Sequence, residues 1–359
     1  MTQREEKIKK ILEKLDQPKY RFGQILDAIY RYRQNDIFSY SKISNLPKEV
    51  REALTDELGS EMLSLKVLTE QTEGKTKKVL FETMDGLRIE TVKMHYRGEK
   101  ERISRFRSNV GRDTICVSVQ VGCGMNCAFC ATGKLGFTRN LNADEIIDQI
   151  LYFRKHDEKV DNVVFMGMGE PLANSSTFDA LEVLVDQKKL EIGQRHISVS
   201  TVGLIPGIKR MTLEHPQINL ALSLHSPFQW EREKIMPISK TFPLVDVMDS
   251  LEEHILKTNR KVLIAYVLLG GFNDTKEHAI ALAEMLNSYE KVKHLFFVNL
   301  INFHEVAGIK FKRSSQRAVD DFRAILQSYG IRNTLRQDFG ERIDAACGQL
   351  SGKKTNYNC

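Results

Sequence analysis

The sequence predicts an α/β fold in which a partial (β/α)6 barrel follows a small, mainly helical N-terminal α+β domain. Two observations lead to this prediction. From about residue 114, short apolar runs with strand character alternate with amphipathic helical stretches, which is typical of parallel βα units. Before residue 95 the pattern is first helical and then extended, without such alternation. A chain of 359 residues is long enough for one large core and a small accessory domain.

The N-terminal domain is predicted to span residues 1–95 and to begin with three helices. Apolar residues recur at helical spacing over residues 8–15 and 22–29, and Pro47 is placed to open a third helix that Gly59 ends. Residues 77–83 and 87–94 are extended runs, and Asp85-Gly86 between them is a strong hairpin signal. We therefore expect helices followed by a β-hairpin.

The barrel is predicted to occupy residues 96–359. Its strands are expected at residues 114–121, 162–168, 196–201, 218–225, 261–269 and 295–301. Its helices are expected near residues 143–156, 175–187, 244–259, 276–288 and 315–329, with Asn142 and Glu145 as a capping pair for the first of them. In a barrel of this kind the active site lies at the C-terminal ends of the strands.

Composition excludes several classes of protein. No run of about 18 apolar residues is present and the first ten residues are polar and charged, so we expect neither a membrane span nor a signal peptide, and a cytoplasmic location. Six cysteines are too few and too clustered for a disulfide framework in a chain of this length. Metal or redox chemistry explains them better.

The formal net charge of +6 is modest and decides nothing alone. Basic side chains do crowd one stretch before the cysteine cluster. This stretch is compatible with contact to RNA phosphates or with a solvated loop. Its members are Lys93, Arg97, Lys100, Arg102, Arg105, Arg107 and Arg112.

Three cysteines follow the first predicted barrel strand directly: Cys123, Cys127 and Cys130. Thiolates are the usual ligands of a [4Fe–4S] cluster, and three of them leave one iron open to bind a substrate. A structural zinc ion is the alternative, but such an ion is bound by four protein ligands, and no second Cys-x-x-Cys pair exists in the sequence.

The spacing of these cysteines, with Phe129 directly before Cys130, resembles the signature of the radical S-adenosylmethionine (SAM) superfamily. The resemblance implies that the amino and carboxylate groups of SAM bind the open iron. An electron from the cluster then cleaves SAM to a 5′-deoxyadenosyl radical. In such enzymes the cofactor carries the difficult chemistry, and the protein supplies orientation and excludes water.

Flanking residues narrow the resemblance to the RlmN/Cfr family of RNA adenine methyltransferases, nearest to RlmN. The similarity covers nearly the whole chain and keeps the order of the family's motifs. Its blocks are residues 123–133 (CGMNCAFCATG), 136–141 (GFTRNL), 167–172 (GMGEPL), 198–201 (SVST), 222–226 (LSLHS) and 343–350 (IDAACGQL).

This resemblance implies an unusual methyl transfer that uses two SAM molecules for each methyl group. One SAM methylates Cys347, and a second gives the radical that activates this methyl group for addition to adenine. Cys116 then attacks the thioether sulfur and forms a disulfide with Cys347, while Glu90 matches the proton acceptor. By pattern alone, Cys116 would be a small buried residue, Cys347 a loop residue and Glu90 a solvated strand residue.

The SAM contacts implied by the resemblance fall at the ends of successive predicted strands. They are Gly169, Glu170, Ser200, Ser223, Leu224, His225 and His304. The family usually has an asparagine where His304 is placed here. A lone histidine at such a position is more often a core residue, so the argument rests on the shared position at strand ends.

The substrate implied by the family is an adenosine of large-subunit (23S) ribosomal RNA, with transfer RNA as a second target of the RlmN branch. RlmN methylates C2 of adenine and Cfr methylates C8, where methylation blocks antibiotics. Pro171 and residues 136–141 favour C2, which we predict, whereas residues 224–227 and 260–266 resemble the Cfr branch. We also expect an electron donor such as flavodoxin, a monomer, and an N-terminal domain that contacts RNA.

Two other classes remain as alternatives. A radical SAM enzyme that activates a glycyl-radical partner would share the cluster but would have no use for Cys116 and Cys347. A zinc-bearing RNA-binding protein would share the basic stretch but not the SAM site. The sixth cysteine, Cys359, has no counterpart in the family and is interpreted as an incidental free thiol.

Overall fold

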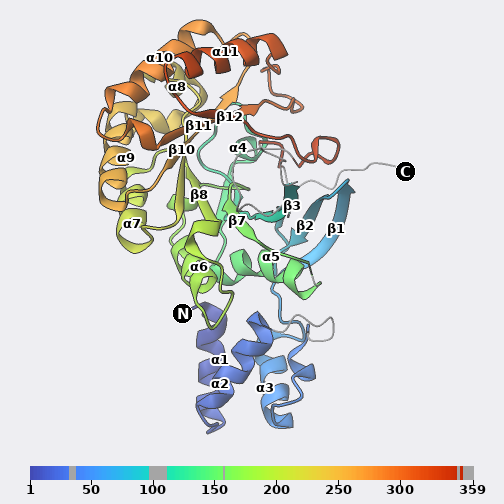
Figure 1. Cartoon of the computed structure of the whole chain (residues 1–359). Helices are drawn as coiled ribbons and strands as arrows, with labels where there is room; N and C mark the ends of the chain where they lie inside the picture. Colours follow the sequence, from blue (N-terminus) through green and yellow to red (C-terminus); the bar gives the residue numbers. More distant parts are fainter. Residues whose placement is uncertain (32–37, 97–110, 157, 346–347, 351–359) are drawn as a thin grey trace.

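The computed structural model describes residues 1–31, 38–96, 111–156, 158–345 and 348–350. One sheet of ten strands dominates it, in the order β1-β2-β3-β4-β7-β8-β9-β10-β11-β12 (Figure 1). The strands are β1 (Lys66–Glu73), β2 (Thr76–Glu82), β3 (Arg88–Tyr96), β4 (Arg112–Cys116), β7 (Asn162–Phe165), β8 (Ile197–Thr201), β9 (Asn219–Ser223), β10 (Val262–Leu268), β11 (Phe296–Asn302) and β12 (Asn333–Leu335).

Within this sheet β4, β7, β8, β9, β10, β11 and β12 are parallel, as the βα pattern predicted. Helices cover their outer side (Figure 1). These are α5 (Ala143–Lys155), α6 (Ser176–Val185), α7 (Ile205–Glu214), α8 (Gln229–Ile235), α9 (Leu244–Thr258), α10 (Lys276–Ser288) and α11 (Gln316–Ser328). The five predicted helices are present, and Asn142 and Glu145 form the predicted capping box of α5. None of the described helices is long and apolar enough to cross a membrane.

Three details of the barrel differ from the prediction. The run at residues 114–121 is not one strand, because β4 ends at Cys116 and β5 (Gln120–Gly122) pairs instead with β6 (Phe137–Asn140) in a separate small sheet. Helix α7 was missed, because Pro206 and Gly207 suggest a turn, although proline is favoured in the first turn of a helix. The short α8 and β12 were also missed.

The N-terminal residues, predicted as one small domain of three helices followed by a hairpin, form two separate parts. Helices α1 (Gln3–Lys14), α2 (Tyr20–Tyr30) and α3 (Lys48–Leu58) project beyond the barrel (Figure 1). The predicted hairpin is present, with Gly86 at a φ of +78° in its turn, but β3 pairs with β4 and so extends the barrel sheet. The predicted boundary at residue 95 therefore falls inside a continuous sheet.

Helix α1 is held against the barrel by a buried charge network. Arg4 donates to the carboxylate of Asp148 at 2.5 Å, and its backbone N–H donates to Asp144 at 2.8 Å. Asp148 also accepts from the backbone and the hydroxyl of Ser64, at 2.6 and 2.7 Å. Because both aspartates lie on α5, the projecting helices have a defined position relative to the sheet.

Candidate active site

The three cysteines of the predicted cluster loop lie between β5 and the short helix α4 (Ala131–Lys134). All three line one cavity. Cys123 and Cys127 are buried, and Cys130 is partly exposed. The structure thus brings the three predicted ligands to one side of a single hollow.

Local geometry fixes this loop. The backbone N–H of Cys123 donates to the carbonyl of Gly136, and that of Ala128 donates to the carbonyl of Ile235, both at 2.8 Å. Gly122 enters the loop with a φ of +73°, and a Cβ there would lie 1.9 Å from the Gly136 carbonyl oxygen. Only glycine fits this position, because a side chain would be strained by both the backbone angle and the contact.

The electrostatics of the loop suit a bound cluster. Burial raises the pKa of the Cys123 thiol to about 11, and burial likewise raises the pKa of Cys127, with repulsion from the neighbouring thiolates adding to both shifts. Three thiolates are therefore stable here only beside compensating cations, as in an iron–sulfur cluster. No three His, Cys, Asp or Glu side chains in the described ranges converge on a single ion. A cubane does not require this, since each thiolate binds a different iron.

The predicted SAM residues line the same cavity as the cysteines. Gly169, Glu170, Ser200, Ser223 and His225 all contribute to its wall. Ser200 lies in β8 and Ser223 ends β9, and Gly169 and Glu170 follow β7, so they meet at the C-terminal edge of the parallel sheet. Leu224 is fully buried behind them, and its backbone N–H donates to Ala265 at 3.0 Å.

Glu170 is held in a fixed position at this edge. Its carboxylate accepts from the backbone N–H groups of Val202, at 2.9 Å, and Leu172, at 3.2 Å. Its own N–H donates to the side-chain oxygen of Gln120 at 3.0 Å. Burial raises the pKa of Glu170 to about 7, although these hydrogen bonds favour the carboxylate. The group is thus poised to bind a cation or an amino group near neutral pH.

His225 is a neutral ring in the same wall. Burial, and then the nearby Arg232, lower its pKa to about 3. The backbone N–H of Val267 donates to Nδ1 of His225 at 2.9 Å, so the proton of the ring is assigned to Nε2. The ring of Phe129, from the cluster loop, lies edge-on to it at a centroid distance of 4.8 Å. His225 can therefore offer an N–H donor to a ligand beside the cluster loop.

We expect the affinity for SAM to depend on the ionisation of Glu170. Below its pKa of about 7 the carboxyl group is protonated and holds the SAM amino group weakly, so affinity should rise about tenfold between pH 6 and pH 8. The Glu170→Gln variant should bind SAM more weakly, and its affinity for SAM should not show this rise between pH 6 and pH 8. Anaerobic calorimetry of the cluster-loaded protein measures both. Equal slopes in the two proteins would exclude Glu170 as the group responsible.

Cys116 lies in a second hollow that adjoins the first. It ends β4 opposite Val92 of β3 and is buried. Its cavity is also lined by Cys130 and Thr132, which line the cluster cavity as well. The structure therefore places Cys116 and the cluster loop around adjoining parts of one hollow.

Glu90 is buried rather than solvated, at 1% exposure. Alternate residues of β3 share a face, so Glu90 points to the same side as Val92, which lines the Cys116 cavity. Lys78 forms an ion pair with its carboxylate at 3.2 Å and donates to the carbonyl of Asp344 at 3.4 Å. This lysine could not be predicted from sequence, because its pairing with Glu90 depends on the register of β2 and β3.

Cys347 lies outside the described residues. The segment that carries it does contribute to the Cys116 cavity through Ala345 and Gly348. The Gly348 carbonyl accepts from the backbone N–H of Ala131 at 2.8 Å, and the Leu350 carbonyl accepts from the Thr132 hydroxyl at 2.6 Å. Helix α4, which follows the cluster loop, thus also holds the chain beyond Cys347.

His304 does not line the cavity of the other predicted SAM residues. Its ring is buried beside Asp338, at 3.2 Å, and borders the Cys116 cavity. Asn299, inside β11, instead lines a hollow shared with Ser200 and Ser223. We overlooked Asn299 in the sequence, although a polar residue within the apolar run of β11 was an available signal. Arg336, which follows β12 and borders both hollows, was also overlooked.

The predicted basic stretch is described only at its ends, since residues 97–110 lie outside the described residues. At its start, Lys93 forms ion pairs with Asp113, at 3.3 Å, and Glu158, at 2.7 Å. Lys93 is therefore neutralised within the protein, and these ion pairs do not support phosphate contact, which was one of the two interpretations of the stretch. Arg112 is exposed at the first position of β4.

Comparison with known proteins supports the same chemistry. Residues 117–285 match the model of the radical SAM superfamily. A protein of Clostridium botulinum (strain Loch Maree / Type A3) named ribosomal RNA large subunit methyltransferase Cfr is 43% identical over 344 residues, which cover 96% of each chain. A protein of the same name from Staphylococcus warneri is 42% identical over 98% of this chain and 97% of its own length.

A solved structure agrees with these relatives. The radical SAM methyltransferase of Sphaerobacter thermophilus has a TM-score of 0.85 and 35% identity, covering 95% of this chain and 96% of its own. The predicted fold is thereby confirmed, and the predicted cofactors, a [4Fe–4S] cluster and SAM, are those of the superfamily. Similarity of this extent shows that the chain belongs to the RlmN/Cfr family of radical SAM methyltransferases.

Proposed function

We propose that the chain methylates an adenine carbon in large-subunit ribosomal RNA. The observation that carries this proposal is the shared wall of the two hollows, to which Cys130 and Thr132 contribute on both sides. A SAM molecule held at the strand ends would lie close to Cys116. The names of the relatives, ribosomal RNA large subunit methyltransferases, support the substrate.

Each residue has a defined part in the proposed reaction. When bound, the cluster supplies the electron for cleavage of SAM. Glu170 orients the amino group of SAM, and Cys347 carries the methyl group. Glu90 accepts the proton that leaves the base. Cys116 attacks the sulfur of Cys347 and a disulfide forms. The electron pair of the broken sulfur–carbon bond stays with the transferred carbon, which takes up a proton and becomes the methyl group. This disulfide has to be reduced before the next turnover.

For the carbon that is methylated, we propose C8, with C2 as the second candidate. Pro171 and residues 136–141 led us to predict C2. The relatives reported above are named Cfr and match over nearly the whole chain. We give this similarity more weight than Pro171 and residues 136–141, which are two short motifs. The target adenine has to leave its stack to reach a buried site, and this costs least in an RNA loop.

The decisive test is to identify the methylated base. Anaerobically reconstituted, reduced enzyme is incubated with SAM and unmodified ribosomal RNA, and the digested RNA is compared by mass spectrometry with C2- and C8-methyladenosine standards. We expect the C8 product. Cys116→Ala should still cleave SAM but release no methylated RNA. Absence of both products, although the cluster is present and SAM is cleaved, would contradict the RNA substrate.

Three further expectations remain predictions: a flavodoxin-type electron donor, a monomeric state and a transfer RNA substrate. The last is tested in the same assay by adding unmodified transfer RNA. The alternative of a zinc-bearing RNA-binding protein predicts a colourless protein, whereas a cluster protein is brown.

A further inference from the structure

Six basic side chains gather at the edge of the sheet opposite the SAM residues. This group, named here the basic edge, lies just before the first residues of β8, β10, β11 and β12. Parallel strands that are aligned in register begin at a common edge, and Val262 of β10 pairs with Phe296 of β11. The members of the basic edge are Arg195, Arg260, Lys261, Lys291, Lys293 and Arg332.

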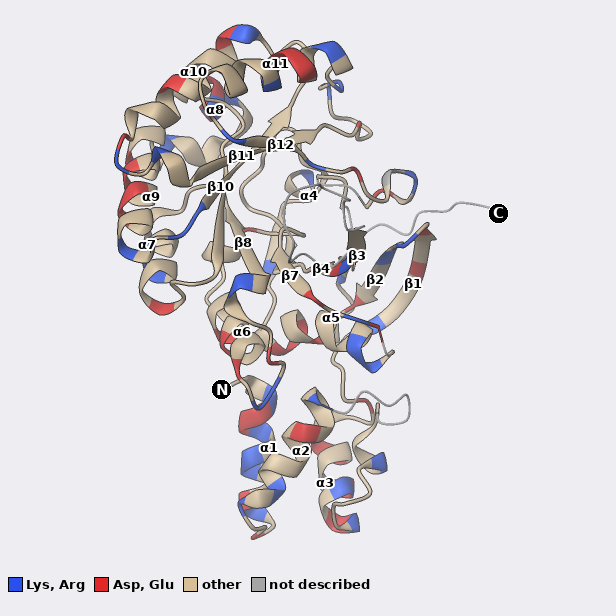
Figure 2. Cartoon of the chain, viewed as in Figure 1, with Lys and Arg blue, Asp and Glu red and all other residues tan. Residues whose placement is uncertain are grey.

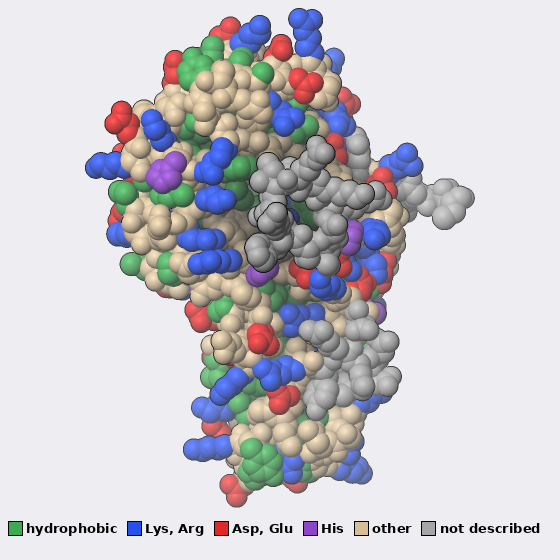
Figure 3. Space-filling view, viewed as in Figure 1, with side chains coloured by type: hydrophobic (Ala, Val, Ile, Leu, Met, Phe, Trp, Pro, Cys, Tyr) green, Lys and Arg blue, Asp and Glu red, His purple; other side chains and the backbone are tan. Residues whose placement is uncertain are grey.

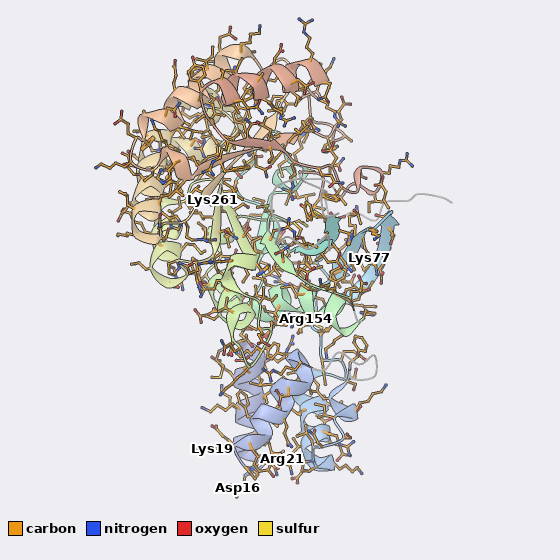
Figure 4. The ribbon with its side chains drawn as sticks, in the orientation of Figure 1. Asp16, Lys19, Arg21, Lys77, Arg154 and Lys261 are labelled. Atoms are coloured by element: carbon orange, nitrogen blue, oxygen red, sulfur yellow. The ribbon has the colours of Figure 1, made fainter. Side chains whose placement is uncertain are left out.

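The figures agree with this placement. Figure 3 shows Lys and Arg side chains gathered on the face of the barrel that is turned toward the viewer. Figure 4 places Lys261 on the same face, at the start of β10. Five of the six side chains are exposed, and Arg260 is half-buried.

No member of the basic edge forms an ion pair with an acidic side chain among the described residues. Arg195 donates instead to the neutral side chain of Gln217 at 3.2 Å. Arg260 donates to the neutral side chain of Asn219 at 2.7 Å, and Asn219 in turn donates to the carbonyl of Arg195 at 2.8 Å. The two guanidinium groups are therefore held near each other by uncharged partners.

This edge differs from the outer helices, where acids and bases alternate (Figure 2). Arg210 pairs with Glu214 at 2.8 Å, and Lys257 pairs with Glu253 at 2.6 Å. At the basic edge, by contrast, burial and then the charge of Arg195 lower the pKa of Arg260, and its Nε is buried without a hydrogen-bond partner in the described structure. A bound anion would relieve this repulsion.

We propose that the basic edge binds phosphates of the RNA that flanks the target nucleotide. This inference rests on the proposed function. The five neighbouring strands from β8 to β12 span about 19 Å, at about 4.8 Å between strands, which is enough for several phosphates of one RNA backbone. Exposed cations that form no ion pairs among the described residues are typical of a surface that binds nucleic acid.

Distance within the barrel distinguishes RNA from an acidic protein partner. The basic edge and the SAM residues lie at opposite ends of strands of five to seven residues, which separates them by about 17–23 Å. An electron donor has to approach the cluster loop, which lies at the other end. A large folded RNA is long enough to contact both the basic edge and the SAM residues, whereas an isolated target loop contacts only the end with the SAM residues.

The test compares two RNAs on the cluster-loaded holoenzyme. One is a minimal stem-loop that carries the target adenosine, and the other is a large-subunit RNA fragment that also contains the flanking helices. The variant carries Arg195→Glu, Lys261→Glu and Lys293→Glu together. We expect it to bind the long fragment at least about tenfold more weakly, with a salt slope smaller by about 2–3, and to bind the stem-loop as the wild type does.

The matched control reverses three exposed bases of α7 and α9, Lys209→Glu, Arg210→Glu and Lys257→Glu, which changes the net charge equally. The proposal is overturned if both triple variants weaken RNA binding equally, or if the basic-edge variant binds the long RNA normally. It is also overturned if that variant only raises the KM for a reduced flavodoxin. If the basic-edge variant binds the long RNA weakly while the wild-type enzyme makes no methyladenosine, the surface is supported and the proposed function is contradicted.

Discussion

Cys127→Ser is expected to give a colourless protein that cleaves no SAM. Cys127 is one of three thiols that line the cluster cavity, and no other cysteine among the described residues lines it. A serine hydroxyl is a poor substitute for a thiolate on iron, and the loop can offer no replacement thiol. Visible absorption, iron and sulfide content, and release of 5′-deoxyadenosine measure the effect. We expect activity at the level of cluster-free protein.

The matched control for this substitution is Cys359→Ser. Residue 359 is the last of the sequence and lies outside the described residues, and no role is predicted for it. Its replacement should leave colour and SAM cleavage unchanged. If Cys127→Ser kept its broad visible absorption and its SAM cleavage, Cys127 would not be a cluster ligand.

Arg232→Met is expected to lower the free energy of unfolding by about 3–5 kcal/mol and to abolish SAM binding. Arg232 is fully buried on α8. Its guanidinium donates to the carbonyls of Val202 at 2.5 Å and Leu224 at 3.2 Å, and to the hydroxyl of Ser239 at 2.7 Å. Methionine fills similar space but leaves these oxygens without a donor. Denaturant unfolding and calorimetry with SAM measure the two losses.

The effect on SAM follows from where these bonds lie. Val202 and Leu224 are next to the ends of β8 and β9, where Ser200 and Ser223 line the cavity. Lys257→Met is the control, because Lys257 is exposed on α9 and forms its ion pair with Glu253. It should change stability by no more than about 0.5 kcal/mol. A similar cost for both variants would show that the buried bonds of Arg232 contribute little.

Regular patterns made much of the fold predictable. The alternation of apolar runs and amphipathic helices indicated six parallel strands, and all six are present in the sheet. The cysteine spacing needed no tertiary information, because the three thiols lie on one short loop. The strand-end motifs were predictable for a related reason: the carboxyl ends of parallel strands meet at one edge.

Features that depend on pairing between distant segments were not predictable in the same way. Lys78 and Glu90 meet only because β2 and β3 pair in one particular register. In the sequence, Arg232 resembles an ordinary exposed charge on a short amphipathic segment, because its burial depends on the tertiary structure. His304 was placed with SAM by its position after a strand, but its ring points to Asp338, which comes 34 residues later.

The attachment of the C-terminal segment to α4 has a consequence for the life of the protein in the cell. The carbonyls of Gly348 and Leu350 are held by Ala131 and Thr132, directly after the third cysteine of the loop. Loss of the iron would remove the ligand bonds of that loop and leave it only its backbone hydrogen bonds, so that residues 348–350 would be released more readily. Proteases act first on such released ends. The iron content of the enzyme would then set its lifetime, and damaged copies would be removed before they bind ribosomal RNA without modifying it.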